Sequence, residues 1–188
     1  LINISSGKTL GELYQAKLVI EAIIEDLAIK QEVFSKLELL LADDVILATN
    51  TSSIDLNIMG SVLKRPQYLV VMHFFNPAPI MALVEIVRSK DTASAVAETV
   101  FTLAEKWGKS PVNVRSSPGL IVNRVARPFY SEALEVLKEG GTDAAGCDTI
   151  MRECGFFRMG PFELMDLIGL DVNYAVTSQI WESYHRHP

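Results

Sequence analysis

The chain has 188 residues, 49% of them apolar, which is enough to bury the core of one medium domain or two small ones. Its 17 basic and 23 acidic residues are mixed along the chain and give a net charge of −6, which argues against nucleic acid or an anionic membrane as a partner. Because there is no signal peptide and no apolar run of roughly 18 residues, we expect a soluble cytoplasmic protein.

Apolar runs alternate with helical patterns over the first part of the chain. The apolar runs predict strands at Leu1–Ile4, Lys17–Ile23, Val45–Ala48, Tyr68–Phe74, Leu83–Val87 and Pro111–Arg115. Apolar spacing and capping residues predict helices at Thr9–Gln15, Leu27–Leu41, Asp55–Leu63 and Thr92–Trp107. This alternation favours an α/β fold with a mainly parallel sheet that helices cover.

From Ser116 onward the pattern is almost entirely helical. Helices are expected at Gly119–Glu139, with a kink at Pro128, and at Thr142–Glu153, Pro161–Ile168 and Asp171–Tyr184. We therefore predict two domains, one at 1–115 and an all-α one at 116–188. About 70 residues make a thin core on their own, so packing on the first domain or on a second copy is expected, and a homodimer is the prediction.

Two cysteines and both chain ends give weaker signals. Cys147 and Cys154 have neither a CxxC spacing nor a nearby histidine, so we expect reduced thiols and no metal site. The chain starts on a strand-like segment without Met and ends as abruptly. We therefore expect it to be a piece of a longer protein.

One histidine and one glutamate stand where chemistry is expected. His73 ends the apolar run Tyr68–Met72, at a strand end of the kind where open α/β sheets bind ligands. Glu85 is the single acid of the run Leu83–Val87, where an unpaired charge would be costly. A neighbouring strand would bring Glu85 to one ring nitrogen of His73, leaving the other to exchange a proton with substrate. The plain alternative is a core histidine bonded to a backbone carbonyl, with Glu85 on a solvated strand face.

Ordered motifs along the whole chain point to one known family. They are Leu18–Ile23 with Glu25 and Lys30, Ala48–Ser53, His73–Pro77 with Leu83–Glu85, Pro118-Gly119 with Ile121–Arg124, and Met159–Leu164. In these residues the chain resembles the 3-hydroxyacyl-CoA dehydrogenase family. The sequence of Asn123–Ala133 looks most like that of the bacterial enzymes of phenylacetate breakdown. Their substrate would be 3-hydroxyadipyl-CoA, with 3-hydroxybutyryl-CoA as the shorter relative.

The resemblance implies an NAD-dependent oxidoreductase that interconverts (S)-3-hydroxyacyl-CoA and 3-oxoacyl-CoA. It makes His73 the catalytic acid/base and Glu85 the residue that orients it. It also places Ser52 and Asn123 among the catalytic polar groups that stabilise charge on the substrate oxygen. Without the family, Ser52 would be assigned as a cap for the helix near Asp55, and Asn123 as a solvent-facing residue.

The resemblance also implies a set of cofactor-binding residues. These residues would meet NAD through the backbone of the first two and the side chains of the others: Ala22, Ile23, Glu25, Lys30, Asn50, Ser52 and Asn76. The plain alternatives are that Glu25 and Lys30 are exposed charges at a helix start, and that Asn76 turns the chain before Pro77.

The glycine-rich turn of a dinucleotide-binding fold is absent. Such a fold needs a strand, a GxGxxG turn and a helix whose amides meet the pyrophosphate, and Gly7–Gly11 lacks that spacing. We therefore expect residues 1–115 to be the C-terminal part of a Rossmann-like domain, followed by an all-α dimerisation and substrate domain. The residue that selects NAD or NADP would also lie upstream.

Two other functions compete with this one. A non-catalytic fragment or assembly module could keep the dehydrogenase fold without turnover. A dehydrogenase of small hydroxy acids is a further alternative, but it gives no account of His73 and Glu85.

Overall fold

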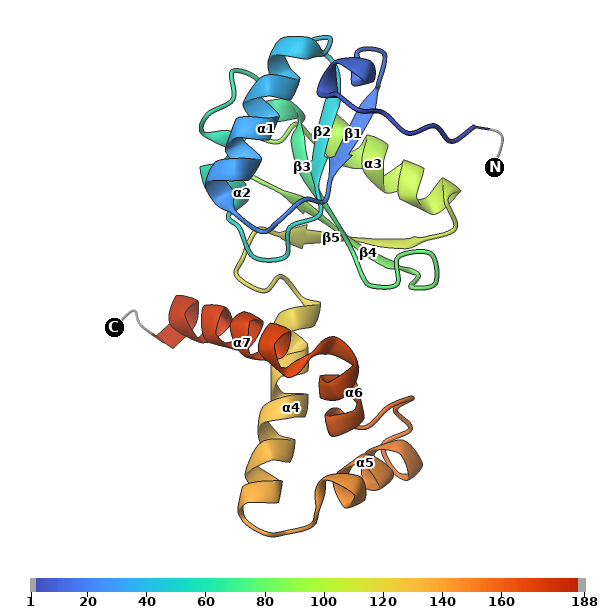
Figure 1. Ribbon diagram of the computed structural model, residues 1–188, viewed down its shortest axis with the longest axis vertical. Helices are drawn as coiled ribbons and strands as arrows, with labels where there is room; N and C mark the ends of the chain where they lie inside the picture. Colours follow the sequence, from blue (N-terminus) through green and yellow to red (C-terminus); the bar gives the residue numbers. More distant parts are fainter. Residues whose placement is uncertain (1–2, 186–188) are drawn as a thin grey trace. The chain divides into compact units, whose positions relative to one another are not determined.

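The computed structural model describes residues 3–185, and the chain forms two compact units, Leu1–Ser117 and Pro118–Pro188 (Figure 1). Each unit is described by itself. Among residues 3–185 no helix is both long enough and apolar enough to span a bilayer.

The first unit is built on a sheet of five strands in the order β1-β2-β3-β4-β5. Their bounds are β1 Leu18–Glu21, β2 Ile46–Thr49, β3 Leu69–Phe74, β4 Leu83–Arg88 and β5 Ser110–Arg115. Neighbouring strands are parallel except β3 and β4, which are antiparallel. The mainly parallel α/β sheet is confirmed. The strand expected at Leu1–Ile4 is wrong where it can be judged, because Asn3 and Ile4 form no strand; its first two residues lie outside the described range.

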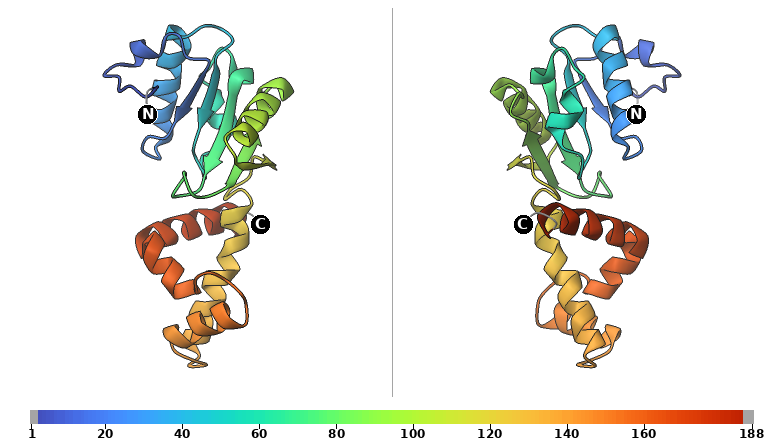
Figure 2. Two further views of the ribbon diagram at one scale, coloured as in Figure 1. Left: turned by 90° about the vertical axis from the view of Figure 1, so that its right-hand side faces the viewer. Right: turned by 90° about the vertical axis from the view of Figure 1, so that its left-hand side faces the viewer.

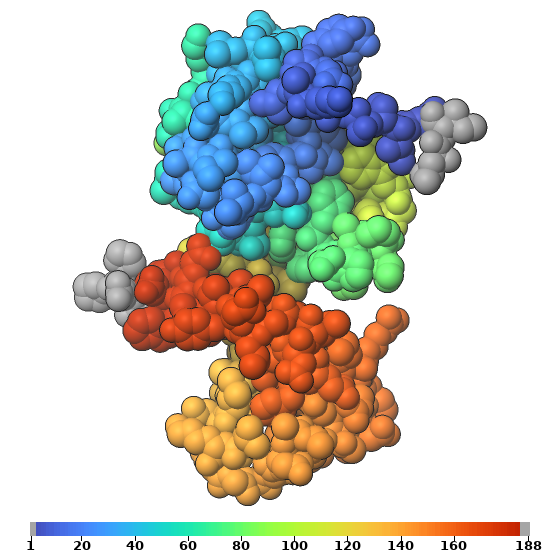
Figure 3. Space-filling model, viewed as in Figure 1, coloured from blue at the N-terminus to red at the C-terminus, as the bar shows by residue number. Residues whose placement is uncertain are grey.

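Helices cover both faces of this sheet. They are η1 Leu10–Leu13, α1 Leu27–Leu40, α2 Leu56–Gly60, η2 Pro66–Tyr68 and α3 Ser94–Lys106. Figure 2 shows α1 and α3 on opposite sides of the strands, and Figure 3 shows η1 beside α1. Strand side chains alternate between the two faces, so each face has its own set of buried residues.

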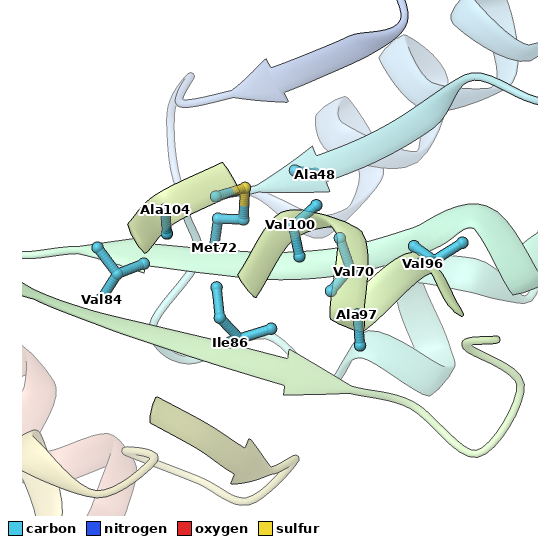
Figure 4. Close-up of a cluster of buried hydrophobic side chains, with 9 residues drawn as sticks. All are labelled: Ala48, Val70, Met72, Val84, Ile86, Val96, Ala97, Val100 and Ala104. Carbon is cyan, nitrogen blue, oxygen red and sulfur yellow. The ribbon is translucent and has the colours of Figure 1, made fainter. Parts of the chain in front are cut away.

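The core beneath α3 is apolar. Figure 4 shows alternate residues of the central strands meeting one side of the helix; the cluster is Ala48, Val70, Met72, Val84, Ile86, Val96, Ala97, Val100 and Ala104. Every member is at most 5% exposed. Thr49, His73 and Glu85 alternate with the residues of this cluster along β2, β3 and β4 and therefore point to the other face.

The second unit is helical throughout its described part, with α4 Val122–Lys138, α5 Ala144–Glu153, α6 Pro161–Ile168 and α7 Leu170–His185. The expected helix at Gly119–Glu139 starts three residues late, at Val122. Gly119 and Leu120 have φ values of 76° and 50°, which a right-handed helix excludes. Asp148 of α5 accepts hydrogen bonds from the backbone N–H groups of Phe162 and Glu163 at 2.8 and 3.2 Å, which caps α6.

The start of α6 has no room for a side chain at Gly160. A Cβ there would collide with Asp148, including its Cα, which cannot rotate away. We expect Gly160→Ala to lower the free energy of unfolding by about 1–3 kcal/mol, as other overpacked sites do. Urea denaturation measures the loss. The control is Gly11→Ala, whose Cβ would meet only the Thr9 hydroxyl at 3.8 Å; an equal loss in both variants contradicts the packing argument.

Candidate active site

The strand register gathers polar side chains on one face, at the carboxyl ends of β1, β2 and β3. Glu21 of β1 pairs with Thr49 of β2, and Thr49 pairs with Val71 of β3. His73 lies two residues beyond Val71 and therefore points to the same face. It pairs with Glu85 of β4. This face is opposite to the apolar core beneath α3.

His73 and Glu85 are in direct contact. His73 Nδ1 lies 2.7 Å from Glu85 Oε2, His73 is 8% exposed and Glu85 is fully buried. The ring of Phe75 contacts the imidazole edge to face, with centroids 4.6 Å apart. The alternative of a solvated Glu85 and a carbonyl-bonded imidazole is wrong. With Nδ1 held by the carboxylate and no partner of Nε2 among residues 3–185, Nε2 is the nitrogen that can exchange a proton.

A buried ionic network lies at the ends of β1 and β2. Glu21 Oε1 accepts two hydrogen bonds, one from Lys30 Nζ at 2.6 Å and one from the backbone N–H of Ile23 at 2.6 Å. Glu21 Oε2 accepts from the Thr49 hydroxyl at 2.7 Å. Glu21 is 5% exposed and Lys30 only 1%, so the expectation of an exposed helix-start charge is wrong for Lys30. Sequence reasoning assigned no role to Glu21, although it is the single acid of an apolar strand, the same signal that singled out Glu85.

Glu25 extends this network toward solvent. Its carboxylate lies 3.3 Å from Lys30 Nζ and accepts hydrogen bonds from the hydroxyls of Thr51 and Ser53. Burial alone would raise the pKa of Glu25. The two hydroxyl donors and the charge of Lys30 outweigh it, and the pKa of Glu25 lies below its ordinary value. Thr51, 2% exposed, is a second residue that sequence reasoning missed.

The lowered pKa of Glu25 predicts an acid-sensitive contribution to stability. The ionised form is favoured in the folded state, so its contribution is present above about pH 4.5 and is lost as the pH falls through the lower folded pKa. Melting temperatures of the wild type and Glu25→Gln, measured from about pH 6 to about pH 3, should converge in acid. A difference that does not shrink with acid rules this role out.

Asn50 is fixed by the neighbouring strand, whereas Ser52 and Asn76 are not held in this way. The Asn50 Oδ1 accepts from the backbone N–H of Phe74 at 2.8 Å, which ties the ends of β2 and β3 together. Ser52 does not cap α2, because Asp55 does so through the N–H of Asn57 at 2.9 Å, and that alternative is wrong.

Ser52 has no hydrogen-bond partner within residues 3–185, and its side chain is half-buried. Asn76 is exposed in the bend after β3, before the cis peptide bond to Pro77. Both side chains are therefore available to a ligand.

Ala22 and Ile23 follow β1 and are exposed, and their segment leads directly into α1. The N-terminus of α1 is capped by Asp26, whose carboxylate accepts from the N–H of Ile29 at 3.0 Å. Because that carboxylate occupies the helix start, α1 offers no cradle for a pyrophosphate. No described residue of this segment therefore fits the pyrophosphate of a dinucleotide.

Asn123 lies in the second unit, in the first turn of α4, and its side chain is half-buried. His73 belongs to the first unit. Among residues 3–185 no group of three or more His, Cys, Asp or Glu side chains is arranged to hold a metal ion.

Comparisons with known proteins agree on one family. Residues 1–117 match the family described as 3-hydroxyacyl-CoA dehydrogenase, NAD binding domain, and residues 119–187 match its C-terminal domain. The chain is 45% identical to 3-hydroxyadipyl-CoA dehydrogenase of Escherichia coli over 92% of its length. It is 40% identical to 3-hydroxybutyryl-CoA dehydrogenase of Clostridioides difficile over 98% of its length.

A solved structure gives the same result. The crystal structure of 3-hydroxybutyryl-CoA dehydrogenase from Escherichia coli has a TM-score of 0.91 and 44% identity, covering 94% of this chain and 37% of that one. The two relatives named above are covered over 36% and 66% of their own lengths, so the chain spans about a third of the first and about two thirds of the second.

Proposed function

Because the chain belongs to the 3-hydroxyacyl-CoA dehydrogenase family, we propose that it carries the acid/base part of an oxidoreductase that interconverts (S)-3-hydroxyacyl-CoA and 3-oxoacyl-CoA with NAD. The observation that carries the proposal is the 2.7 Å contact between His73 Nδ1 and the buried Glu85 carboxylate. That contact leaves one imidazole nitrogen for the proton of a substrate hydroxyl.

His73 moves the proton in this mechanism. In oxidation its Nε2 removes the proton of the 3-hydroxyl, and the imidazolium that forms is stabilised by Glu85 through Nδ1. NAD, when bound, supplies the acceptor for the hydride that leaves C3. In reduction the same imidazolium returns its proton to the 3-oxo oxygen. Because Glu85 is fully buried, its charge is little screened by solvent and holds one ring orientation.

Two polar side chains, one from each unit, are proposed to act on the substrate. Ser52 and Asn123 donate hydrogen bonds to the substrate oxygen as negative charge develops on it. The residues proposed to meet the nicotinamide and ribose of NAD are Ala22, Ile23, Glu25, Lys30, Asn50, Ser52 and Asn76. Lys30 acts within the network of Glu21 and Glu25, because its ammonium is already bound to both carboxylates.

The proposal also covers the domains of the chain and its oligomeric state. We assign residues 1–115 to part of an NAD-binding domain and 116–188 to part of a helical dimerisation and substrate domain, in a cytoplasmic homodimer. The wide apolar exposure of α4 supports the dimer: Val125 is 71%, Leu134 47% and Val136 40% exposed. Sedimentation velocity of the full-length protein measures its oligomeric state.

Turnover is the direct test of the function. The full-length protein that carries this chain should oxidise 3-hydroxybutyryl-CoA or 3-hydroxyadipyl-CoA with formation of NADH, followed by absorbance. A protein that folds and binds NADH but turns over neither thioester favours the non-catalytic assembly module instead.

A further inference from the structure

Arg127 is a partly buried cation that has no acidic partner among residues 3–185. It lies on α4, and Figure 1 shows α7 crossing this part of α4. Its Nε donates to the carbonyl of Asn123 at 2.9 Å, and its Nη1 donates to the Thr177 hydroxyl at 2.7 Å. Nη1 also lies 3.3 Å from both the backbone and side-chain oxygens of Asn173. Among the described residues, no carboxylate forms an ion pair with Arg127 and no acceptor is bound to its Nη2.

A second donor beside the guanidinium has no partner either. Asn173 is 8% exposed, and its Nδ2 is buried without a hydrogen-bond acceptor in the part of the chain that the structure describes. The amide cannot be flipped to relieve this, because Oδ1 faces Arg127, which only donates. Buried donors of this kind are uncommon and call for an explanation.

Within residues 3–185, no neighbouring group neutralises the charge of Arg127. The ring of Tyr130, 5% exposed, lies 4.8 Å from the Arg127 guanidinium carbon. Burial raises the pKa of Tyr130, so its hydroxyl stays protonated and uncharged. Burial lowers the pKa of Arg127, which reflects a cation deprived of water without a carboxylate in return. The guanidinium of Arg127 and the amide of Asn173 together therefore have the chemistry of an anion-binding site.

We propose that Arg127 is a specificity-determining residue that binds the terminal carboxylate of a dicarboxylic 3-hydroxyacyl-CoA. This rests on the proposed function, in which Asn123 meets the oxygen on C3. Arg127 follows Asn123 by one helical turn, which separates their Cβ atoms by about 6 Å. In a six-carbon dicarboxylic chain the terminal carboxylate lies on the order of 5 Å from C3, since about 1.5 Å separates bonded carbons. One face of α4 thus matches both ends of such a chain.

Guanidinium chemistry suits this ligand. Arginine pairs with carboxylates through two parallel N–H donors, and its unused Nη2 supplies the new contacts while Nη1 stays on α7. A methyl-terminated chain of equal length would leave the cation without its partner, which penalises that substrate. Of the relatives, one is named for 3-hydroxyadipyl-CoA, whose chain ends in a carboxylate, and another for 3-hydroxybutyryl-CoA, whose chain does not. Arg127 favours the first kind for this chain.

The test compares two substrates that differ only at the chain end. In the full-length protein, kcat/KM is measured for 3-hydroxyadipyl-CoA and for 3-hydroxyhexanoyl-CoA, before and after Arg127→Met. The expected result is a loss of about 10–100-fold for the adipyl substrate, the usual effect of a charge-assisted hydrogen bond, with the hexanoyl substrate changed less than about threefold. Lys138→Met, which removes an exposed cation from the same helix, should leave both values unchanged.

The outcomes separate this inference from the proposed function. An equal loss on both substrates makes Arg127 only a structural tie between α4 and α7 and overturns the inference, while turnover by the wild type upholds the function. If Arg127→Met does not fold, Arg127→Lys keeps the cation and should still favour the adipyl substrate, but less strongly.

Direct measurement of acyl-CoA binding tests the role of Arg127 if there is no turnover. If the wild type turns over neither thioester, the proposed function fails, and calorimetric affinities for the two acyl-CoA compounds decide the role of Arg127. If Arg127→Met binds 3-hydroxyadipyl-CoA at least tenfold more weakly than the wild type, the role of Arg127 is supported. Unchanged binding overturns that role.

Discussion

Replacement of His73 by alanine is expected to lower kcat of the full-length protein by about 10²–10⁴-fold, the usual contribution of a general acid or base. The imidazole is the group at the carboxyl end of β3 that can exchange a proton through a free nitrogen. Its partner Glu85 is fully buried and holds Nδ1 at 2.7 Å. Glu85→Gln should also cost orders of magnitude, because an amide cannot stabilise the imidazolium. Stopped-flow absorbance of NADH measures both losses.

The binding of NADH separates chemistry from folding. Both variants should bind NADH with an affinity close to that of the wild type, since neither side chain is proposed to hold the dinucleotide. Thr99→Ala is the surface control, because the Thr99 hydroxyl is exposed and bonds only the Ala95 carbonyl of its own helix. Unchanged kcat in His73→Ala or Glu85→Gln would remove the dyad from the mechanism.

Replacement of Lys30 by methionine is expected to lower the free energy of unfolding by about 3–5 kcal/mol, the usual effect of breaking a buried ion pair. Lys30 is 1% exposed, and its ammonium lies 2.6 Å from Glu21 and 3.3 Å from Glu25. The variant leaves the Glu21 carboxylate buried without its cation. Glu21→Gln should be similarly costly, because it leaves the ammonium with only the more exposed Glu25. Urea denaturation followed by circular dichroism measures each loss.

A pair on the same helix provides the control. Lys36 and Glu32 of α1 also form an ion pair, at 2.5 Å, but their side chains are 57% and 65% exposed. Lys36→Met should therefore cost less than about 1 kcal/mol. The double variant Glu21→Gln/Lys30→Met should lose less stability than the sum of its single variants, since the charges are removed together. A Lys30→Met loss no larger than that of Lys36→Met contradicts the buried network.

Patterns within single segments predicted much of the fold. Pro161 at a first helical turn and the apolar run after it predicted α6 with the bounds that the structure has. The lone acid Glu85 and the terminal His73 stood out because charged or titratable groups are rare in buried strands. Glu21 is likewise the single acid of an apolar strand, so the same signal marks it.

The sequence by itself therefore determined the α/β pattern and the change to helices after Ser116, and it marked His73 and Glu85 as candidates, because each of these signals depends on the chemistry of neighbouring residues. Only the tertiary structure decided that β4 runs antiparallel to β3 with Glu85 opposite His73. It also decided that Lys30 is buried and that no carboxylate of the described residues pairs with Arg127. Strand register, burial and charge pairing join residues far apart in the chain, and local periodicity carries no record of them.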